Sequence, residues 1–377
     1  MTHSPGLLLT IIAFVLVIGP LVFVHELGHY LAGRMFGVKA EAFSIGFGRE
    51  LFGITDKRGT RWKFAALPLG GYVKFAGDMN PASMADPAWL SLPPEQRAQT
   101  FQARPLWQRA IVVAAGPVTN FFVAIIILAG FAVAYGEVRT PAVVGAVEAG
   151  SPAALAGLHS GDRITALGSR PVDSFDDVVR FVQIRAGQQV RVDFARNGEQ
   201  RSTNAKIGTR VVHDRFGNRS NIGRLGVGPT AGRVVPVSLL AAPGVAVRKT
   251  GEILGIMGDA IGQMVTGKRP LSELGGPLSI AKVSGEQLSL GAPSFVFLIA
   301  LISINLGFIN LLPVPMLDGG HLLFYAIEAV RRRPVEAQVQ EWAFRGGLLA
   351  VLALMVLATA NDLGALGLWK NLAGLIG

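Results

Sequence analysis

Long apolar segments alternate with polar stretches along this chain of 377 residues. Three of them, residues 7–31, 110–135 and 295–312, approach or exceed the roughly 20 apolar residues that a helix needs to cross a bilayer. A fourth, residues 348–360 with its flanks, is shorter. The pattern predicts four transmembrane helices. We expect the first to be retained, because it lacks the basic start and the small-residue cleavage site of a signal peptide.

Residues 136–230 follow a different pattern, with a balance of charges and short runs of β-branched residues. Strands are predicted at 143–147 and 190–194. Short helices are predicted after Ser151, which suits an N-cap, and at 174–182. We therefore expect one small α+β domain, inserted between the second and third spans.

Two further polar regions have a predictable structure. Residues 61–75 alternate polar with apolar side chains around Gly70 and Gly71, which predicts a strand, a Gly-Gly turn and a second strand beside the membrane. Residues 231–292 connect the inserted domain to the third span. Within them, 247–265 has an apolar face and several charges, so it is either an amphipathic helix at the membrane surface or a helix packed on the inserted domain.

The composition is that of a membrane protein, since 50% of the residues are hydrophobic and 16% are charged. The net charge of +10 could suggest nucleic acid as a partner. We expect no such partner, because the basic residues cluster beside the apolar segments and form no stripe interleaved with aromatics. Cysteine is absent, which excludes disulfides and thiolate metal sites and leaves His, Asp and Glu as ligands.

Loop charge orients the four predicted spans. The loops that follow the first and third spans are rich in Lys and Arg, whereas the extreme N-terminus has neither. By the positive-inside rule these two loops are cytoplasmic, both termini lie outside, and the inserted domain is extracytoplasmic. The C-terminal ends of the first and third spans should therefore reach the same, cytoplasmic side of the bilayer.

A short motif at the end of the first span carries candidate chemistry. His25 and His29 lie one helical turn apart on one face, so both imidazoles can reach one Zn²⁺ ion, and Glu26 lies beside them to polarise water. Ionisable residues at the end of a spanning helix are costly and usually functional, which strengthens a motif that is weak alone. The plain alternative is an interfacial His pair with a Glu that reaches toward water.

A catalytic zinc ion needs a third protein ligand and one open position. Asp318 is the better candidate, because it follows the third span on the same side of the membrane, after prolines that break the helix. Glu41 and Glu50 are alternatives in the manner of soluble zincins, where a later glutamate completes the site. Both lie in a glycine-rich loop without a helical pattern to aim them.

The motifs of this chain together resemble the site-2 protease family, in particular its bacterial regulator-of-sigma-E protease branch. The 150–164 stretch is similar to PDZ domains of bacterial membrane and periplasmic proteases. In the family's order, the motifs are HELGH at 25–29, PLGGYVKF at 68–75, GPVTN at 116–120, GSPAALAGLHSGDRI at 150–164, GGPLSIA at 275–281, NLLPVPMLDGGHLL at 310–323 and Asn361-Asp362.

The resemblance implies an α-helical polytopic membrane protein with four transmembrane helices, three of them forming a protease core, a membrane-associated β-hairpin and one inserted α+β PDZ domain. Residues 1–135 and 293–377 would be the halves of the core, 136–230 the PDZ domain and 231–292 a connecting helical region. The implied protein is an intramembrane zinc metalloprotease of the bacterial cytoplasmic (inner) membrane. Its active site would lie toward the cytoplasm and its PDZ domain outside.

Carried onto this sequence, the family pattern makes His25, His29 and Asp318 the zinc ligands and Glu26 the general base. The implied cofactor is Zn²⁺, and the implied substrates are single-span membrane proteins such as anti-sigma factors or signal peptides, held in a lipid bilayer.

Three further residues would contact substrate. Asn310 would help to hold it, or would make only an interhelical hydrogen bond. Gly70 and Gly71 would lie in a β element that presents substrate as an extended strand. The PDZ domain would either bind a C-terminus left by an upstream protease or act as a steric gate.

Two other functions remain open at this level. A non-catalytic membrane scaffold would use the PDZ domain to tether partners and would bind no zinc. A peptidase of the soluble zincin type would use Glu50, rather than Asp318, as its third ligand.

Overall fold

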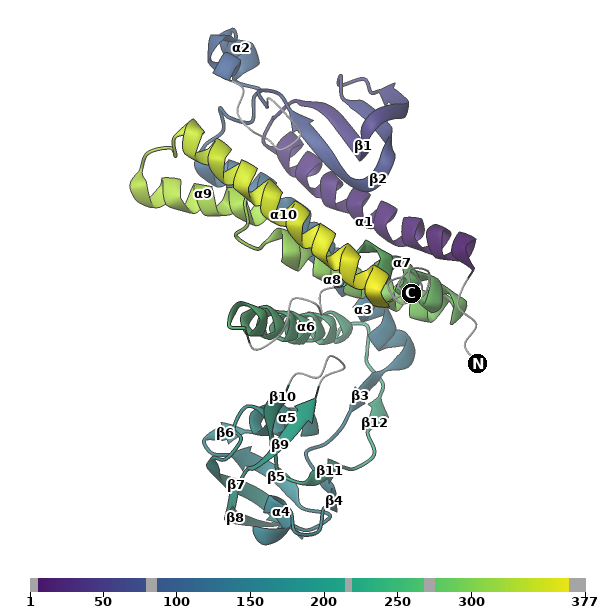
Figure 1. Ribbon diagram of the computed structural model, residues 1–377, viewed down its shortest axis with the longest axis vertical. Helices are drawn as coiled ribbons and strands as arrows, with labels where there is room; N and C mark the ends of the chain where they lie inside the picture. The colour runs from purple at the N-terminus through teal and green to yellow at the C-terminus, as the bar shows by residue number, and fades with distance from the viewer. Residues whose placement is uncertain (1–5, 79–86, 214–218, 268–274, 366–377) are drawn as a thin grey trace, which may run out of the picture. The chain divides into compact units, whose positions relative to one another are not determined.

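The computed structural model describes residues 6–78, 87–213, 219–267 and 275–365 (Figure 1). The chain divides into two compact units. The membrane unit comprises Met1–Ala129, Ala246–Ile261 and Pro270–Gly377, and the inserted unit comprises Gly130–Val245 and Gly262–Arg269. Each unit has its own interior, and each is described separately below.

Four helices are long and apolar enough to cross a membrane, as predicted. They are α1 (Leu7–Met35), α3 (Leu106–Tyr135), α8 (Ala292–Asn310) and α10 (Ala337–Ala365), the last with a candidate span at Gln338–Leu363. The fourth span is longer than the apolar run at 348–360 predicted. The reason is that α10 begins in residues such as Gln338, Glu341 and Arg345, which are good helix formers but interrupt an apolar pattern.

Helix α8 packs against both α1 and α3. Ala13, Val17 and Leu21 of α1 form one buried cluster with Phe295 and Leu298 of α8. A second cluster joins α3 to α8 through Ala124, Leu128, Ala300 and Ile304. Alanines at these contacts let the helices approach closely, which is the usual basis of helix association in a bilayer.

Helix α6 (Ala242–Val265) contributes Ala246 to the second cluster, with Ile253, Leu254 and Met257 packed beside it. Residues 246–261 therefore belong to the membrane unit. The predicted helix with an apolar face is present, and its apolar residues pack against α3 and α8 of the membrane unit.

Strands β1 (Ala40–Thr55) and β2 (Arg61–Phe75) form a hairpin that folds back on itself, which Figure 1 shows beside α1. Residues 42–45 pair with 71–74 on one side and with 61–64 on the other. The turn lies at residues 56–60, where Asp56 accepts hydrogen bonds from the amides of Arg58 and Thr60. The predicted turn at Gly70 and Gly71 was wrong, because both glycines lie within β2.

Shorter elements complete the membrane unit: η1 (Pro87–Ser91), α2 (Pro94–Arg97), α7 (Pro277–Ser289) and α9 (Asp318–Arg331). Asp362 of α10 caps α7 by accepting hydrogen bonds from the amides of Gly276 and Ser279, at 3.1 and 3.0 Å. Arg109 of α3 pairs with Glu328 of α9 at 2.8 Å. One of these polar contacts joins α10 to α7, and the other joins α9 to α3.

The inserted unit contains a four-stranded antiparallel sheet in the order β6 (Arg170–Pro171), β5 (Arg163–Leu167), β7 (Gln189–Arg196) and β8 (Glu199–Lys206). Two helices accompany it, α4 (Pro152–Leu155) and α5 (Phe175–Gln183). The remaining strands form pairs: β3 (Glu137–Arg139) with β12 (Arg233–Val235), β4 (Val144–Val147) with β11 (Val227–Pro229), and β9 (Gly208–His213) with β10 (Arg219–Arg224).

The predicted strands and helices of this unit are all present. Its core is mostly aliphatic, with Val178 and Val182 of α5 buried in one cluster with Ile164, Val192 and Phe194 of the sheet. Strand β8 was not predicted, because its sequence, EQRSTNAK, is polar on both faces. An available signal was the Asn197-Gly198 turn, in which both residues have positive φ, as a tight hairpin requires.

Candidate metal centre

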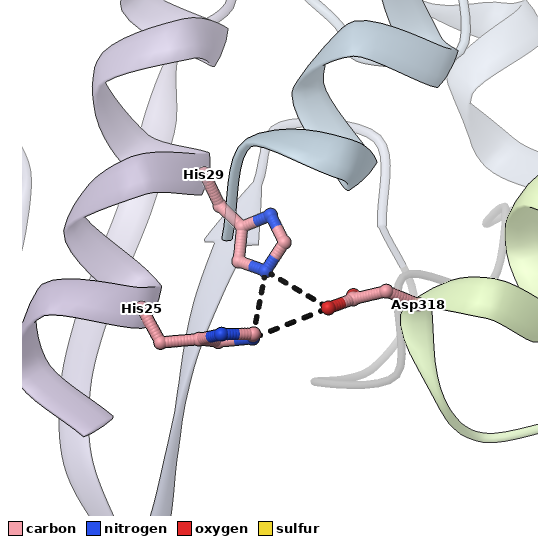
Figure 2. A group of neighbouring side chains, drawn as sticks. All are labelled: His25, His29 and Asp318. Carbon is pink, nitrogen blue, oxygen red and sulfur yellow. Dashed lines mark hydrogen bonds and ion pairs between the residues drawn. The ribbon is translucent and has the colours of Figure 1, made fainter. Parts of the chain in front are cut away.

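Three donor atoms converge between α1 and the start of α9 (Figure 2). The Nε2 atom of His25 lies 3.2 Å from Oδ2 of Asp318, and Nε2 of His29 lies 3.5 Å from the same oxygen. The two Nε2 atoms are 3.2 Å apart. Among the described residues, this is the one group of His, Cys, Asp and Glu that could hold a metal ion.

Local sequence explains how these side chains meet. On α1 the two histidines are four residues apart, so they lie on one face of the helix. Asp318 is the first residue of α9, and the turn before it is tightly packed. A Cβ atom at Gly319 or Gly320 would collide with the backbone of the 311–315 turn, so only glycine fits there.

The donor spacing fits a zinc ion. Ligand atoms about 2.0–2.1 Å from zinc in a tetrahedral site are separated from one another by about 3.3 Å. The three observed separations, 3.2, 3.2 and 3.5 Å, surround that value. The three separations therefore match one face of a zinc tetrahedron, which is the number of protein ligands that catalytic zinc sites have.

The proton positions also favour a cation at this point. Nδ1 of His29 lies 2.9 Å from the carbonyl oxygen of Val112 on α3, which can only accept a hydrogen bond. The neutral ring must then carry its proton on Nδ1 and present a lone pair at Nε2. That lone pair faces a carboxylate oxygen and a second imidazole, and a bound metal ion resolves the repulsion among them.

Helix α3 shapes the space around both rings. A Cβ atom at Gly116 would overlap the ring of His29 and would lie 2.9 Å from Cε1 of His25. Gly28 of α1 meets Thr119 and Ala115 of α3 in the same way, since a Cβ there would overlap both. The two helices can thus approach closely enough for the imidazoles to turn toward Asp318.

Glu26 is buried and lies against the β-hairpin. A Cβ atom at Gly71 would be 2.9 Å from Cγ of Glu26 and 2.7 Å from the carbonyl oxygen of Ser44. The backbone of Val73 also lies close to the Glu26 carboxylate. Strand β2 therefore runs directly past Glu26, and glycine at position 71 is what permits that approach.

The two histidines also stabilise the charged form of Asp318. When both rings carry a proton on Nε2, burial still acts to raise the pKa of the Asp318 carboxyl, but the charge of His29 and hydrogen bonds from both histidines hold that pKa well below its usual range. The carboxylate is thus ionised, as a metal ligand must be.

The other candidate residues lie elsewhere. Asn310 is the last residue of α8, with a partly exposed side chain. Gly70 has a φ of 154°, and a Cβ there would be 2.5 Å from the Phe47 ring. Glu41 pairs with Lys74 and Glu50 with Arg61, so neither belongs to the group of three donors.

Sequence reasoning assigned no role to several residues around this site. Gly116 and Asn120 were noted only as part of the GPVTN motif, and Val112 was not noted. Asn120 is fully buried, and its amide lies 3.1 Å from Nδ1 of His25. The available signal was a polar Thr-Asn pair within an apolar span, because such residues usually serve a purpose.

The inserted unit has a groove of its own, with a volume of about 410 Å³. It runs between α5 and β11, and its lining is largely apolar, including Val178, Val182 and Val227. Arg210 and the backbone of Gly226 lie at its wall.

The chain is similar to known proteins along most of its length. The sequence model of Peptidase family M50 matches residues 13–354. The protein named "Putative zinc metalloprotease Atu1380" of Agrobacterium fabrum is 47% identical over 362 residues, which cover 94% of this chain and 96% of that protein. Metalloprotease MmpA of Caulobacter vibrioides is 37% identical over 396 residues, which cover 98% and 99%.

Solved structures match a smaller part. The PDZ domain of the SdrC-like protein from Listeria monocytogenes aligns with 25% of this chain and 92% of its own, at 19% identity and a TM-score of 0.20. That likeness is too partial to carry an argument, so the fold of the inserted unit rests on its own element order.

Proposed function

Since this chain belongs to peptidase family M50 and is a zinc metalloprotease with several membrane-spanning helices, we propose that it is an intramembrane protease. Its substrates would be single-span membrane proteins, cut within or near their transmembrane segment. The observation that carries this proposal is the convergence of His25, His29 and Asp318 at one point on helices that are otherwise apolar enough to lie in a bilayer.

In this proposal His25, His29 and Asp318 hold the zinc ion. Their spacing and the lone pair at Nε2 of His29 support the assignment. When bound, zinc supplies Lewis-acid polarisation of a carbonyl group and lowers the pKa of water.

Glu26 acts as the general base. Its carboxylate accepts the proton of the attacking water and returns it to the leaving amine, so the same group serves first as base and then as acid. Its burial, with Gly71 of β2 packed against its side chain, keeps the carboxylate beside the histidines. The role needs one fixed carboxylate near the metal ligands, and Glu26 has that position.

Substrate would bind in an extended form along β2. A helix shields its carbonyl carbons, and an unwound segment in lipid needs replacement hydrogen bonds. Among the described residues, 71–74 have one partner strand, 42–45, so a substrate segment could be added to β2 by β-augmentation beside Glu26. Gly70, Gly71 and Asn310 would contact substrate in this arrangement.

We propose the membrane orientation that loop charge predicts. The metal centre would lie toward the cytoplasmic side of a bacterial inner membrane, and the inserted unit would be an extracytoplasmic PDZ domain. The core would consist of residues 1–135 and 293–377, with 136–230 as the PDZ domain and 231–292 as the connection. The apolar groove beside α5 suits a peptide from the substrate or from an upstream cleavage product.

The test is co-expression with a panel of single-span membrane proteins, comparing wild type with Glu26→Gln. The variant should keep its zinc content and lose about 10²–10⁴-fold in cleavage rate, because it lacks only the base. Mass spectrometry of the products should place the wild-type cut within the span. Cleavage by Glu26→Gln at the wild-type rate, or cuts confined to exposed loops, would contradict the proposal.

The scaffold alternative does not hold, because the chain is a metalloprotease.

A further inference from the structure

The two histidines of the metal centre are held by different kinds of partner on α3. Nδ1 of His29 meets the backbone carbonyl of Val112 at 2.9 Å, a group that can only accept. Nδ1 of His25 meets the side-chain amide of Asn120 at 3.1 Å. An amide can face the ring with its oxygen or with its NH₂ group, so this second contact admits two arrangements.

Each arrangement fixes the proton of His25 differently. If the NH₂ group of Asn120 faces Nδ1, the ring accepts there and carries its proton on Nε2, directed at Asp318. If the amide oxygen faces Nδ1, the ring donates from Nδ1 and presents a lone pair at Nε2. Only the second arrangement leaves His25 able to bind a metal ion through the atom that points toward Asp318.

The metal centre, and not the amide's other contacts, selects between the two arrangements. The residue is fully buried, and its Oδ1 atom has no hydrogen-bond partner among the described residues, while Nδ2 faces His25. The two amide atoms cannot be distinguished by shape, so their identity follows from the hydrogen bonds they make. Exchanging them pairs the oxygen with Nδ1–H of His25 and leaves the NH₂ group in the position without a described partner, so the requirement for a lone pair at Nε2 of His25 decides for the second arrangement.

The backbone of Asn120 is fixed independently of its amide. Ser303 of α8 donates its hydroxyl to the Asn120 carbonyl oxygen at 2.7 Å, and both residues are fully buried. The amide thus extends from an anchored position and can only rotate about its own side-chain bonds.

We propose that Asn120 is a positioning residue that selects the tautomer of His25. Its amide oxygen accepts from Nδ1–H and thereby directs the Nε2 lone pair to the zinc ion. The inference rests on the proposed role of His25 as a zinc ligand and adds the residue that makes this role possible.

Three variants test the proposal in the purified full-length protein. Asn120→Leu has a similar shape but no acceptor, so Zn²⁺ affinity, measured by competition with a chromophoric chelator, should fall by about 10–100-fold. Asn120→Asp keeps an acceptor and has no NH₂ group, so its affinity should stay within about 3-fold of wild type or increase, since a carboxylate raises the basicity of a ligating histidine. Ser303→Ala removes the backbone anchor alone and should change affinity by less than about 3-fold.

The outcomes separate this proposal from the one that it rests on. If Asn120→Leu binds Zn²⁺ like wild type, or if Asn120→Asp is weakened as much as Asn120→Leu, tautomer selection by Asn120 is wrong. A fall in Ser303→Ala equal to that in Asn120→Leu would assign the effect to helix packing, and would also contradict it. If His25→Ala itself retains wild-type affinity, the zinc assignment of His25 fails instead.

Discussion

The membrane unit and the inserted unit distribute their polar residues in opposite ways. In the membrane unit, two histidines and a carboxylate meet inside a group of apolar helices, and glycines at 28, 71 and 116 make room for them. In the inserted unit the interior consists mainly of apolar side chains, and the charged pairs other than Asp162 with Arg196 are more exposed. We therefore expect single substitutions near the metal centre to have large effects on metal binding. In the inserted unit, stability is the sum of many contacts, so single substitutions should have smaller effects.

The strongest test of this contrast is Asp318→Ala. Loss of a partner of a ligating histidine costs about 10–100-fold in metal affinity, and loss of a ligand itself should cost more. We expect zinc content after dialysis to fall to background and proteolysis to be lost. Hydrogen exchange of the inserted unit should be unchanged. If the variant retained zinc, the assignment of Asp318 as a ligand would be wrong, since a third ligand would then have to come from outside the group of three.

A second test uses two glycines of the same helix. Gly116→Ala places a Cβ against both imidazoles and should weaken Zn²⁺ binding by about 10–100-fold, as other changes beside a ligand do. Gly130→Ala is the matched control, because no atom lies within 4 Å of a Cβ at that position. Chelator competition measures both variants. Equal affinities would mean that α3 does not shape the site.

In the inserted unit, the corresponding test is the substitution of Asp162, for which we expect a smaller effect. Its carboxylate is buried and accepts two hydrogen bonds from Arg196, at 2.7 and 2.8 Å. Burial would raise its pKa, but these bonds and the amide of His159 hold the pKa below the ordinary value. Asp162→Asn should destabilise this unit by about 2–3 kcal/mol at neutral pH, read as faster hydrogen exchange in β5 and β7, with zinc content unchanged.

The sign of the pH dependence follows from that lowered pKa. The stabilisation from Asp162 is present above its unfolded pKa of about 3.9 and is lost as the pH falls through the lower folded value. Wild type should therefore lose protection of β5 and β7 below about pH 4 more steeply than Asp162→Asn does. Parallel pH profiles for the two proteins would show that the pair contributes nothing.

The smallest expected effect belongs to Glu50→Ala. This carboxylate pairs with Arg61 on a partly exposed part of the hairpin, so its loss should cost about 0–1 kcal/mol and leave zinc affinity unchanged. The same chelator assay decides it. A large drop in affinity would restore the soluble zincin arrangement, in which Glu50 rather than Asp318 completes the site.

The elements that follow a periodic pattern of apolar residues, or that contain a local sequence motif, could be predicted from the sequence. Apolar length predicted four spans, and alternation predicted the strands that line the core of the inserted unit. Loop charge predicted that the first and third spans run parallel, which is why Asp318 could be grouped with His25 from the sequence alone. These predictions depend only on residues that are close in sequence and on the requirement that apolar segments cross a bilayer.

What could not be predicted depends on contacts between distant segments. Gly70 and Gly71 suggested a turn, whereas the structure uses glycine there because Phe47 and Glu26 lie too close for a side chain. The contact between Asn120 and His25 joins residues 95 positions apart, so no local pattern reveals it. The close approach of two distant segments and the orientation of a side-chain amide produce no periodic pattern in the sequence, so neither could be predicted from it.

The separation of the three donors along the chain has a consequence for biogenesis. His25 and His29 leave the ribosome early, whereas Asp318 follows only after the inserted unit and the third span have been made. At roughly 5–20 residues per second, the interval lasts on the order of tens of seconds. Throughout that time the nascent chain has two of its three candidate donors, so a metal site that needs all three forms only after Asp318 has been made.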